Sequence, residues 1–264
     1  MDSRIWQWNL NGARSRAWCL KSMCRARPLA VLLNEPHLDP DDPLDVPGYQ
    51  CFRCDRPTVT KRSGGALILV RADIQVTRFQ TDSTPLPLPS EWVAVHLALA
   101  ANLPELVLVT GYRSPAAHSA PLDFLREYLS DSQHRGVPCI AAGDFNVDFH
   151  TIPTVETEFG AELRAAIDGH HLLPSRGPTR VTTETATTID IWVANSFAMP
   201  LLHPLVQTYG QSGSDHRRTC ILLQLPTLEP FPEPEPEPEA LTAPLVRWDY
   251  RRANWLTFTL AVTV

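Results

Sequence analysis

The sequence lacks the contiguous motifs that mark several large classes of phosphate-handling and hydrolytic enzymes. It contains no Gly-x-x-x-x-Gly-Lys phosphate loop, no Gly-x-Ser-x-Gly nucleophile elbow and no His-Glu-x-x-His zinc helix. These absences exclude the enzyme classes that depend on such motifs. Any catalytic residues must therefore come from segments that are separated along the chain.

Long apolar runs, targeting signals and paired cysteine motifs are also missing. No apolar stretch approaches the ~18 residues of a membrane helix, and the N-terminus lacks a basic and apolar signal region. Cys51 and Cys54 have zinc-like spacing, but no second Cys or His pair follows at finger distance. We therefore expect an intracellular, soluble protein with no membrane partner.

The chain has no excess of positive charge. Its formal net charge is −6, which argues against a surface that binds polyanions everywhere. The basic residues form local groups instead: Arg14, Arg16 and Lys21; Arg53, Arg56, Lys61 and Arg62; and Arg217 and Arg218 beside His216. Positive charge can therefore face a phosphate locally, while the overall excess of carboxylates suits a bound divalent cation.

Apolar runs and their periodicity predict many strands with few helices between them. Strands are expected at about 3–10, 29–33, 49–53, 65–71, 74–80, 91–99, 105–112, 137–142, 188–194, 204–208 and 217–225. Helices are expected at about 15–26, 121–134 and 157–168. This order favours the α/β class, with two packed mixed sheets and outer helices in one domain over residues 1–226.

The composition changes abruptly after residue 226. Residues 227–244 include a near alternation of Pro and Glu, which cannot bury apolar area and predicts an extended linker. Residues 245–264 begin with an aromatic and basic stretch from Arg247 to Trp255. We expect this last segment to be the start of a further region that the chain does not contain.

Five short segments, spread over most of the chain, carry the polar side chains that metal-assisted phosphodiester hydrolysis needs. Four follow an apolar, strand-forming run and one leads into such a run, and strand ends are where an α/β sandwich exposes residues to a shared cleft. The segments are Trp8-Asn9-Leu10-Asn11-Gly12, Asn34-Glu35-Pro36-His37, Gly143-Asp144-Phe145-Asn146, Thr188-Ile189-Asp190 and Ser214-Asp215-His216. Together they predict an enzyme.

The residue types fit the individual steps of that chemistry. Glu35, at the end of an apolar run, is the best metal ligand, because hard cations such as Mg²⁺ prefer carboxylate and amide oxygens. Asp144 could take a proton from water while Asn146 donates to phosphate, and Gly143 would permit close backbone approach. Each of these residues alone is equally typical of an ordinary turn or strand end.

The later segments supply a charged imidazole. A carboxylate beside a histidine fixes its tautomer and raises its pKa, so Asp190 could hold His216 if the two late strands adjoin. Tyr112 follows an apolar strand and could offer its hydroxyl to a phosphate oxygen, although ordinary packing explains it as well.

These segments, with Gly111-Tyr112, resemble the endonuclease/exonuclease/phosphatase superfamily, which includes apurinic/apyrimidinic endonucleases and DNase I-like nucleases. The resemblance covers about residues 4–224 and is strongest to the endonuclease domain of LINE-type (non-LTR) retrotransposons. It implies an α/β fold, a four-layered α/β sandwich of two mixed β-sheets flanked by helices, with a cleft at one end of the sheets.

The resemblance also implies a role for each motif residue. Glu35 would be the principal ligand of Mg²⁺, with Mn²⁺ as the alternative ion, while Asn11 and Asp215 would lie near the metal. Asp144 would orient or deprotonate the water, and Asp190 would hold His216, which stabilises the pentacovalent state. The residues implied to contact phosphate or DNA are Asn9, Tyr112 and Asn146, with Ser214 and Thr179 as supporting hydroxyls.

Two positions depart from the pattern of the superfamily. Many relatives carry an Asn shortly after the tyrosine, whereas Arg113-Ser114-Pro115 follows here. Asn11 stands where repair enzymes usually have Asp, which favours the retrotransposon branch. Residues 247–255 resemble the stretch that leads from endonuclease to reverse transcriptase, so we expect a fragment or truncated copy of a longer reading frame.

The leading hypothesis is a Mg²⁺-dependent endonuclease that nicks one strand of DNA and leaves a 3′-hydroxyl able to prime reverse transcription. Its partners would be DNA and, through the missing reverse transcriptase, element RNA, and the protein would act as a monomer in the nucleus. One alternative is a phosphatase or phosphodiesterase of the same superfamily with another substrate. Another is an inactive remnant that binds nucleic acid.

Overall fold

The computed structural model describes residues 2–56, 64–79, 90–99, 105–114, 122–148, 158–203, 205–211 and 213–224. All of them belong to Met1–Thr227, the first of two units into which the chain divides. The predicted linker at 227–244 and the predicted fragment at 245–264 lie outside the described residues. No helix in the described ranges is long and apolar enough to cross a membrane.

The first sheet has six strands in the order β13-β14-β1-β2-β4-β3. The pair β1 and β2 is parallel and the other neighbours are antiparallel, so the sheet is mixed. Its strands are β1 (Arg4–Asn9), β2 (Ala30–Asn34), β3 (Tyr49–Cys54), β4 (Ala66–Arg71), β13 (Gln207–Gln211) and β14 (Arg217–Leu222). Parallel neighbours bring the ends of β1 and β2 to the same edge of the sheet.

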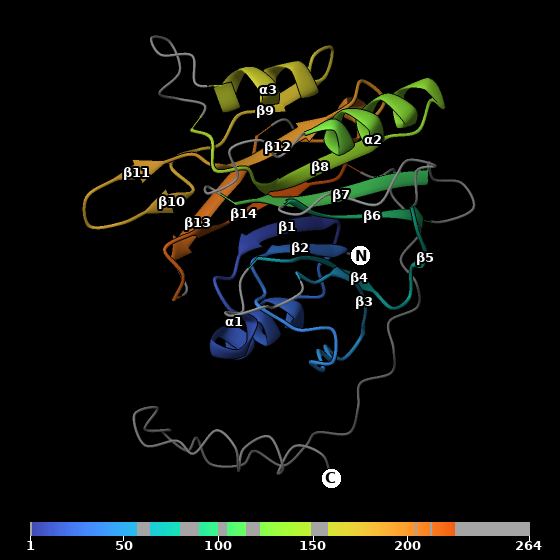
Figure 1. Ribbon diagram of the computed structural model, residues 1–264. Helices are drawn as coiled ribbons and strands as arrows, with labels where there is room; N and C mark the ends of the chain where they lie inside the picture. The colour runs from blue at the N-terminus through green and yellow to red at the C-terminus, as the bar shows by residue number, and fades with distance from the viewer. Residues whose placement is uncertain are drawn as a thin grey trace, which may run out of the picture. The chain divides into compact units, whose positions relative to one another are not determined.

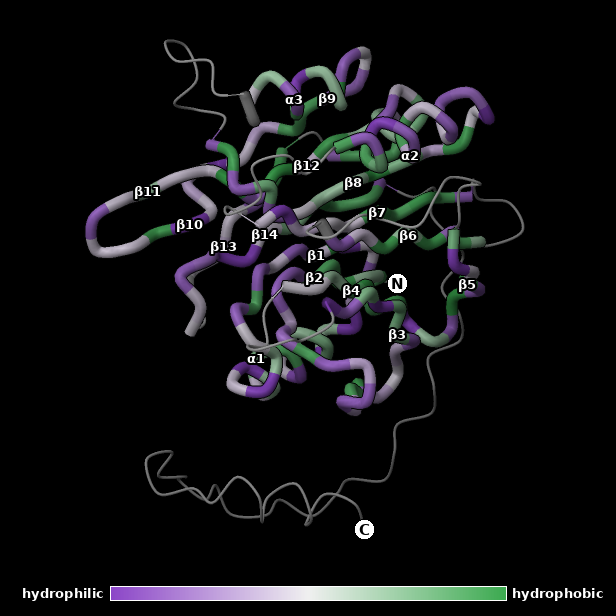
Figure 2. The backbone as a smooth tube through the Cα atoms, viewed as in Figure 1, coloured by the Kyte–Doolittle hydropathy of each residue, from purple (hydrophilic) through white to green (hydrophobic). Residues whose placement is uncertain are grey.

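The second sheet also has six strands, in the order β5-β6-β7-β8-β12-β9. Here β7 and β8 are the parallel pair among antiparallel neighbours. The strands are β5 (Gln75–Arg78), β6 (Ser90–Ala98), β7 (Glu105–Arg113), β8 (Cys139–Asp144), β9 (His171–Leu173) and β12 (Asp190–Ala194). Hydrophobic residues are concentrated along β7, β8 and β12 in Figure 2.

Helices cover the outer face of each sheet, and the two sheets lie between them (Figure 1). Helix α1 (Ala13–Arg25) packs through Leu20 and Met23 against Trp8 and other side chains of the first sheet. Helices α2 (Asp123–His134) and α3 (Glu158–Ala166) pack through residues such as Leu129 and Leu163 on the second sheet. The prediction of a four-layered α/β sandwich is confirmed.

Strand alternation assigns side chains to the two faces of each sheet. In β1, Trp6 and Trp8 face α1, so Gln7 and Asn9 point to the opposite face, toward the other sheet. Gln7 Nε2 donates to Asp190 Oδ1 in the second sheet at 2.8 Å. Polar side chains therefore lie between the sheets, where each needs a hydrogen-bond partner.

Most predicted elements are present, with small shifts of their ends. The strand predicted at 204–208 is an exception, because Val206 bridges to Ser175 and β13 begins only at Gln207. Three short strands and a 3₁₀ turn had no signal in the sequence. They are β9, β10 (Arg180–Val181), β11 (Ala186–Thr187), which pairs with β10, and η1 (Met199–Leu201). Strands of two or three residues are too short to show periodicity.

Candidate active site

Polar side chains at the ends of strands from both sheets meet between the sheets. In the first sheet, Asn9 of β1 is the register partner of Asn34 of β2. In the second sheet, Asp144 of β8 lies between Tyr112 of β7 and Asp190 of β12. Register partners on one face of a sheet have side chains close to one another. The topology therefore gathers the predicted residues from distant parts of the sequence.

Several of these residues follow the strands in a left-handed backbone conformation. The φ angle is 48° at Asn11, 49° at Glu35 and 52° at Asn146. Residues other than glycine rarely adopt this conformation, and such exceptions cluster at functional sites. At Glu35 the turn is held by its backbone N–H, which donates to the carbonyl of Gly65 at 3.0 Å. The backbone thus leaves each strand abruptly at these three residues.

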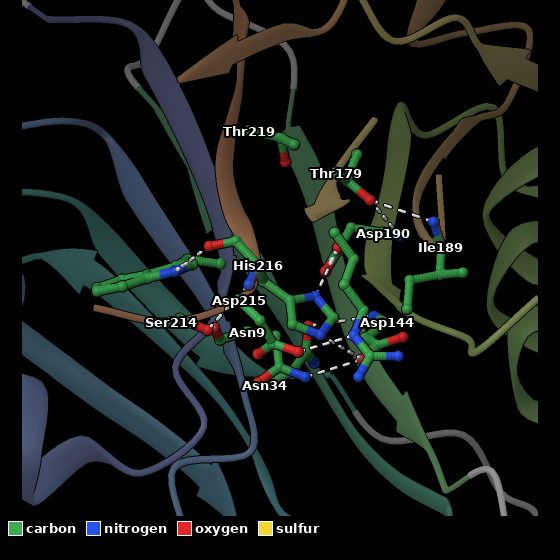
Figure 3. A network of polar contacts seen from close by, with 12 residues as sticks. Asn9, Asn34, Asp144, Thr179, Ile189, Asp190, Ser214, Asp215, His216 and Thr219 are labelled. Atoms are coloured by element: carbon green, nitrogen blue, oxygen red, sulfur yellow. Dashed lines mark hydrogen bonds and ion pairs between the residues drawn. The ribbon is translucent and has the colours of Figure 1, made fainter. Parts of the chain in front are cut away.

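The side chains of Asp190 and His216 form a buried pair (Figure 3). His216 Nδ1 lies 2.8 Å from Asp190 Oδ2, and Gln7 Nε2 donates to the other carboxylate oxygen. The hydroxyl of Thr179 accepts the backbone N–H of Asp190 at 3.0 Å. Both carboxylate oxygens and the backbone of Asp190 are therefore held in place, which also fixes the orientation of the imidazole.

Further hydrogen bonds position His216 against the first sheet. The hydroxyl of Ser214 donates to the backbone carbonyl of Asn9 at 2.9 Å and accepts the backbone N–H of His216 at 3.1 Å. The indole N–H of Trp8 donates to the carbonyl of His216 at 3.3 Å. Ser214 and Thr179 therefore support the His216–Asp190 pair through the backbone, as Figure 3 shows.

A second chain of contacts runs from His216 to Glu35. His216 Nε2 lies 3.7 Å from Asp144 Oδ2, which accepts a hydrogen bond from Asn9 Nδ2 at 2.8 Å. The same amide nitrogen also lies 3.2 Å from Glu35 Oε2 and donates to it. The backbone N–H of Asn146 donates to Asp144 Oδ1 at 3.0 Å. One connected network thus joins the imidazole, the central carboxylate and the predicted metal ligand.

Burial and charge shift the pKa values of the central pair. Burial alone would lower the pKa of His216, but the charges of Asp190 and Asp144 and the hydrogen bond to Asp190 outweigh it and raise the pKa to about 9. Burial and the charge of Asp190 raise the pKa of Asp144 to about 7, although His216 opposes this rise. At neutral pH the imidazole is therefore charged, and Asp144 can gain or lose a proton.

Glu35 and Tyr112 have opposite shifts. Burial would raise the pKa of Glu35, but hydrogen bonds from His37, Tyr112 and Asn9 together lower it. Burial and the charge of Glu35 raise the pKa of the Tyr112 phenol. Glu35 is therefore a carboxylate at neutral pH, and Tyr112 remains a hydrogen-bond donor.

The donor chemistry of the site fits a hard divalent cation at Glu35. Asp144, Asp190 and His216 place their ligand atoms within 4.8 Å of one another, as a metal site could. Within the protein, both oxygens of Asp190 accept hydrogen bonds, and His216 Nδ1 lies 2.8 Å from one of them. The carboxylate of Glu35 adds ionised oxygen donors of the kind that hard divalent cations prefer.

A model of the endonuclease/exonuclease/phosphatase family matches residues 6–216. The chain belongs to this family. The match begins in β1 and ends at His216, so it contains all the residues of the network from Gln7 onward. Members of this family are hydrolytic nucleases and phosphatases, and they generally depend on divalent metal ions. No curated protein matches the sequence.

Several solved structures have a similar fold. The endonuclease domain of TRAS1, a telomere-specific non-LTR retrotransposon, is 17% identical with a TM-score of 0.64, over 85% of this chain and 100% of that domain. The apurinic/apyrimidinic endonuclease of Leishmania major is 14% identical with a TM-score of 0.67, over 85% of this chain and 88% of that one. A 3′ phosphatase from Neisseria, solved with a product DNA hairpin, is 16% identical with a TM-score of 0.58, over 84% and 99%.

Three residues named from the family pattern have other contacts in this structure. The side-chain amide of Asn146 donates to the carbonyl of Arg113 at 2.7 Å. Asn11 is exposed, and its backbone N–H donates to Asn9 Oδ1 at 2.9 Å. Asp215 accepts a hydrogen bond from Arg180, described below. All three lie on segments that carry network residues, but their side chains are not part of the central network.

Sequence reasoning missed several residues of the network. Asn34 Oδ1 accepts from Gln7 at 3.0 Å and from the backbone N–H of Asp144 at 3.2 Å, so it links the two sheets. Glu91, the register partner of Tyr112, is buried, and burial raises its pKa to about 7. A polar residue on the inward face of an otherwise apolar strand was the available signal for Gln7 and Asn34.

Proposed function

We propose that the protein is a divalent-metal-dependent endonuclease that nicks one strand of DNA and leaves a 3′-hydroxyl, as the endonuclease of a non-LTR retrotransposon would. The observation that carries this proposal is the connected network from Asp190 through His216, Asp144 and Asn9 to Glu35. It combines a charged imidazole, a carboxylate with a near-neutral pKa and an ionised metal ligand. A remnant without activity would have no need of all three.

Asp144 acts as the general base that takes a proton from the attacking water. A general base works best when its pKa lies near the working pH, and the pKa of Asp144 is raised to about 7. Asn9 Nδ2 and the backbone N–H of Asn146 hold the two carboxylate oxygens in a fixed orientation. Proximity and orientation of this kind contribute to hydrolysis by aligning the water with the phosphorus.

His216 and Tyr112 stabilise charge on the phosphate. The imidazolium of His216 is oriented by Asp190 and can hydrogen-bond a phosphate oxygen as negative charge develops. The Tyr112 phenol stays protonated and can donate to another oxygen. A cation held by Glu35, with Asn11 and Asp215 nearby, would neutralise the charge of the phosphate oxygens and of the leaving alkoxide.

DNA is the substrate that the likeness in fold and sequence favours. The chain spans the whole length of the TRAS1 endonuclease domain, and residues 247–255 resemble the stretch that precedes a reverse transcriptase in such elements. With this substrate the protein acts on chromosomal DNA in the nucleus. The 3′-hydroxyl then serves as primer on an element RNA.

A plasmid nicking assay tests the proposal. Supercoiled DNA is incubated with the full chain and Mg²⁺, Mn²⁺ or a chelator, and the variants His216→Ala and His216→Gln are assayed alongside after their folding is checked by circular dichroism. We expect metal-dependent conversion to open circles, lost in both variants. A DNA polymerase should extend the nicks without prior phosphatase treatment, because each nick ends in a 3′-hydroxyl.

The other outcomes identify the alternatives. Release of phosphate from a 3′-phosphorylated duplex without plasmid nicking would show a phosphatase of the same family. Binding of DNA by a folded protein that hydrolyses neither substrate would show a binding remnant. Either result would overturn the proposed endonuclease.

A further inference from the structure

Arg180 is attached to the segment that carries the charged histidine. It is the first residue of β10, and its backbone forms an antiparallel bridge with His216. The neighbouring hydrogen bonds run from Val181 N–H to the Asp215 carbonyl at 2.9 Å and from Arg217 N–H to the Thr179 carbonyl at 2.6 Å. The hairpin of β10 and β11 therefore holds Arg180 directly opposite His216.

The guanidinium of Arg180 is oriented by Asp215 and remains half-exposed. Nε of Arg180 donates to Asp215 Oδ2 at 2.8 Å. The arginine side chain is 40% exposed and that of the aspartate 29% exposed. Within the described parts of the chain, Nε is the only nitrogen of this guanidinium with a hydrogen bond in the structure. An arginine carries five N–H donors in a planar fork, so the outer donors can bind an incoming oxyanion.

The carboxylates around Arg180 make a positive charge at this position useful for binding a phosphate. Asp215, Asp144 and Asp190 all act on Arg180. The hydrogen bond that Arg180 donates to Asp215 raises the pKa of the guanidinium against the effect of burial, and the charges of the three carboxylates add to the rise. A phosphodiester entering the site meets these carboxylates and Glu35, and all of them repel it. A fixed cation beside them would offset that repulsion.

Two other arginines near the site cannot supply that cation. Arg113 follows Tyr112, in the stretch where many relatives carry an Asn, but its side chain is 2% exposed and its Nη2 donates to Glu162 of α3 at 3.1 Å. Arg16 gives its three nitrogens to backbone carbonyls, with Nη1 at 2.6 Å from Asn11 O and Nη2 at 2.7 Å from Gly213 O. Both side chains already donate hydrogen bonds to groups of the protein.

We propose that Arg180 binds a phosphate oxygen of the cleaved DNA strand, with Asp215 as the carboxylate that orients its guanidinium, an assignment that rests on the proposed function. In this arrangement Asp215 orients Arg180 for the phosphate contact, in addition to its proposed place near the metal.

Salt dependence of DNA binding is the measurement that separates this role from a structural one. A short duplex is titrated with the full chain, by fluorescence anisotropy in a chelator, between about 50 and 200 mM salt. Loss of one phosphate contact lowers the slope of log affinity against log salt by about 0.9. We expect that decrease for Arg180→Ala, with weaker binding at every salt concentration, whereas Arg180→Lys keeps the slope because it keeps the charge.

The matched control is Arg135→Ala, at the residue that caps the C-terminus of α2. Arg135 is also half-exposed and also pairs with an aspartate, Asp131 at 3.3 Å, but it lies on the outer face of the second sheet. It should leave the slope and the nicking rate unchanged. Thermal unfolding of each variant checks the fold, and Arg180→Gln replaces the alanine variant if the latter does not fold.

The outcomes are distinct for the two proposals. If the wild-type protein nicks DNA and the substitutions at Arg180 reduce nicking without changing the salt slope, Arg180 only positions the His216 segment and the phosphate contact is wrong. If the wild-type protein neither binds nor nicks the duplex, the endonuclease itself is wrong, and the phosphate contact proposed here is lost with it. A raised KM for Arg180→Ala, with a smaller change in kcat, would support the contact.

Discussion

Asp190 Oδ2 lies 2.8 Å from Nδ1 of His216, although the two residues belong to segments of different sheets. Both side chains are almost completely removed from water. In that environment the carboxylate charge acts strongly on the imidazole and keeps its proton well above neutral pH. The pair therefore supplies a fixed positive charge between the sheets, directed at Asp144 through Nε2.

Replacing Asp190 by Asn should remove the negative charge of the carboxylate while keeping a side chain of nearly the same shape. We expect nicking to fall by about 10²–10⁴-fold, the usual contribution of a positioned acid or base. The pKa of His216 should also fall, because Asp190 is the strongest of the influences that raise it. Steady-state nicking rates over a range of pH measure both effects. Asp131→Asn on α2 is the control, and near wild-type activity of Asp190→Asn would contradict the role of the pair.

The rate of nicking should follow a bell-shaped curve in pH. Asp144 acts as a base only when ionised, so activity rises as the pH passes its raised pKa of about 7. His216 acts only when protonated, so activity falls as the pH passes about 9. Because the two groups interact, the two limbs report apparent values of the pair. A flat profile between about 6 and 10 would exclude both assignments.

Glu35→Gln should weaken the metal site without disturbing the rest of the network. The amide keeps one oxygen but loses the negative charge that a hard cation requires. We expect the Mg²⁺ concentration for half-maximal nicking to rise by about tenfold or more, as in other sites that lose a ligand or its support. Glu105→Gln is the matched control, because Glu105 begins β7 at the end of the strand away from Tyr112 and the site. If the Mg²⁺ concentration for half-maximal nicking is unchanged in Glu35→Gln, Glu35 is not the principal metal ligand.

Gly143→Ala should destabilise the fold at the junction of β7 and β8. A Cβ at residue 143 would lie 2.1 Å from the carbonyl oxygen of Gly111, which no side chain can tolerate without displacing a strand. We expect a loss of about 1–3 kcal/mol in the free energy of unfolding, as for other overpacked interiors. Gly177→Ala has open space around its Cβ and serves as control in the same denaturant titration. Equal stability of the two variants would show that the strands can separate without cost.

The local order of strands and helices could be read from the sequence because it depends on neighbouring residues. Alternation in residues 3–10 predicted β1, and it also implies that Asn9 faces away from Trp8 and α1. The buried run before Glu35 and the one before Asp144 likewise predicted strands that end at the site. Polar residues at such ends are conspicuous, so most of the candidate site could be named without coordinates.

The relationship between the segments could not be read in the same way. The pairing of Asp190 with His216 was predicted on the condition that their strands adjoin, but β12 and β14 lie in different sheets and the pair forms across the sandwich. Gln7 and Asn34 gained their roles only from that packing. The bridge between Arg180 and His216 joins residues from a two-residue strand and a loop.

The sequence by itself determined which segments form strands, which residues end them and which chemistry those residues can perform, because periodicity and residue type are local properties. The tertiary structure decided which side chains touch, which are buried deeply enough to shift their pKa values and which arginine faces the site. Those properties arise from sheet order, register and the stacking of the two sheets, and each depends on contacts between residues far apart in the chain.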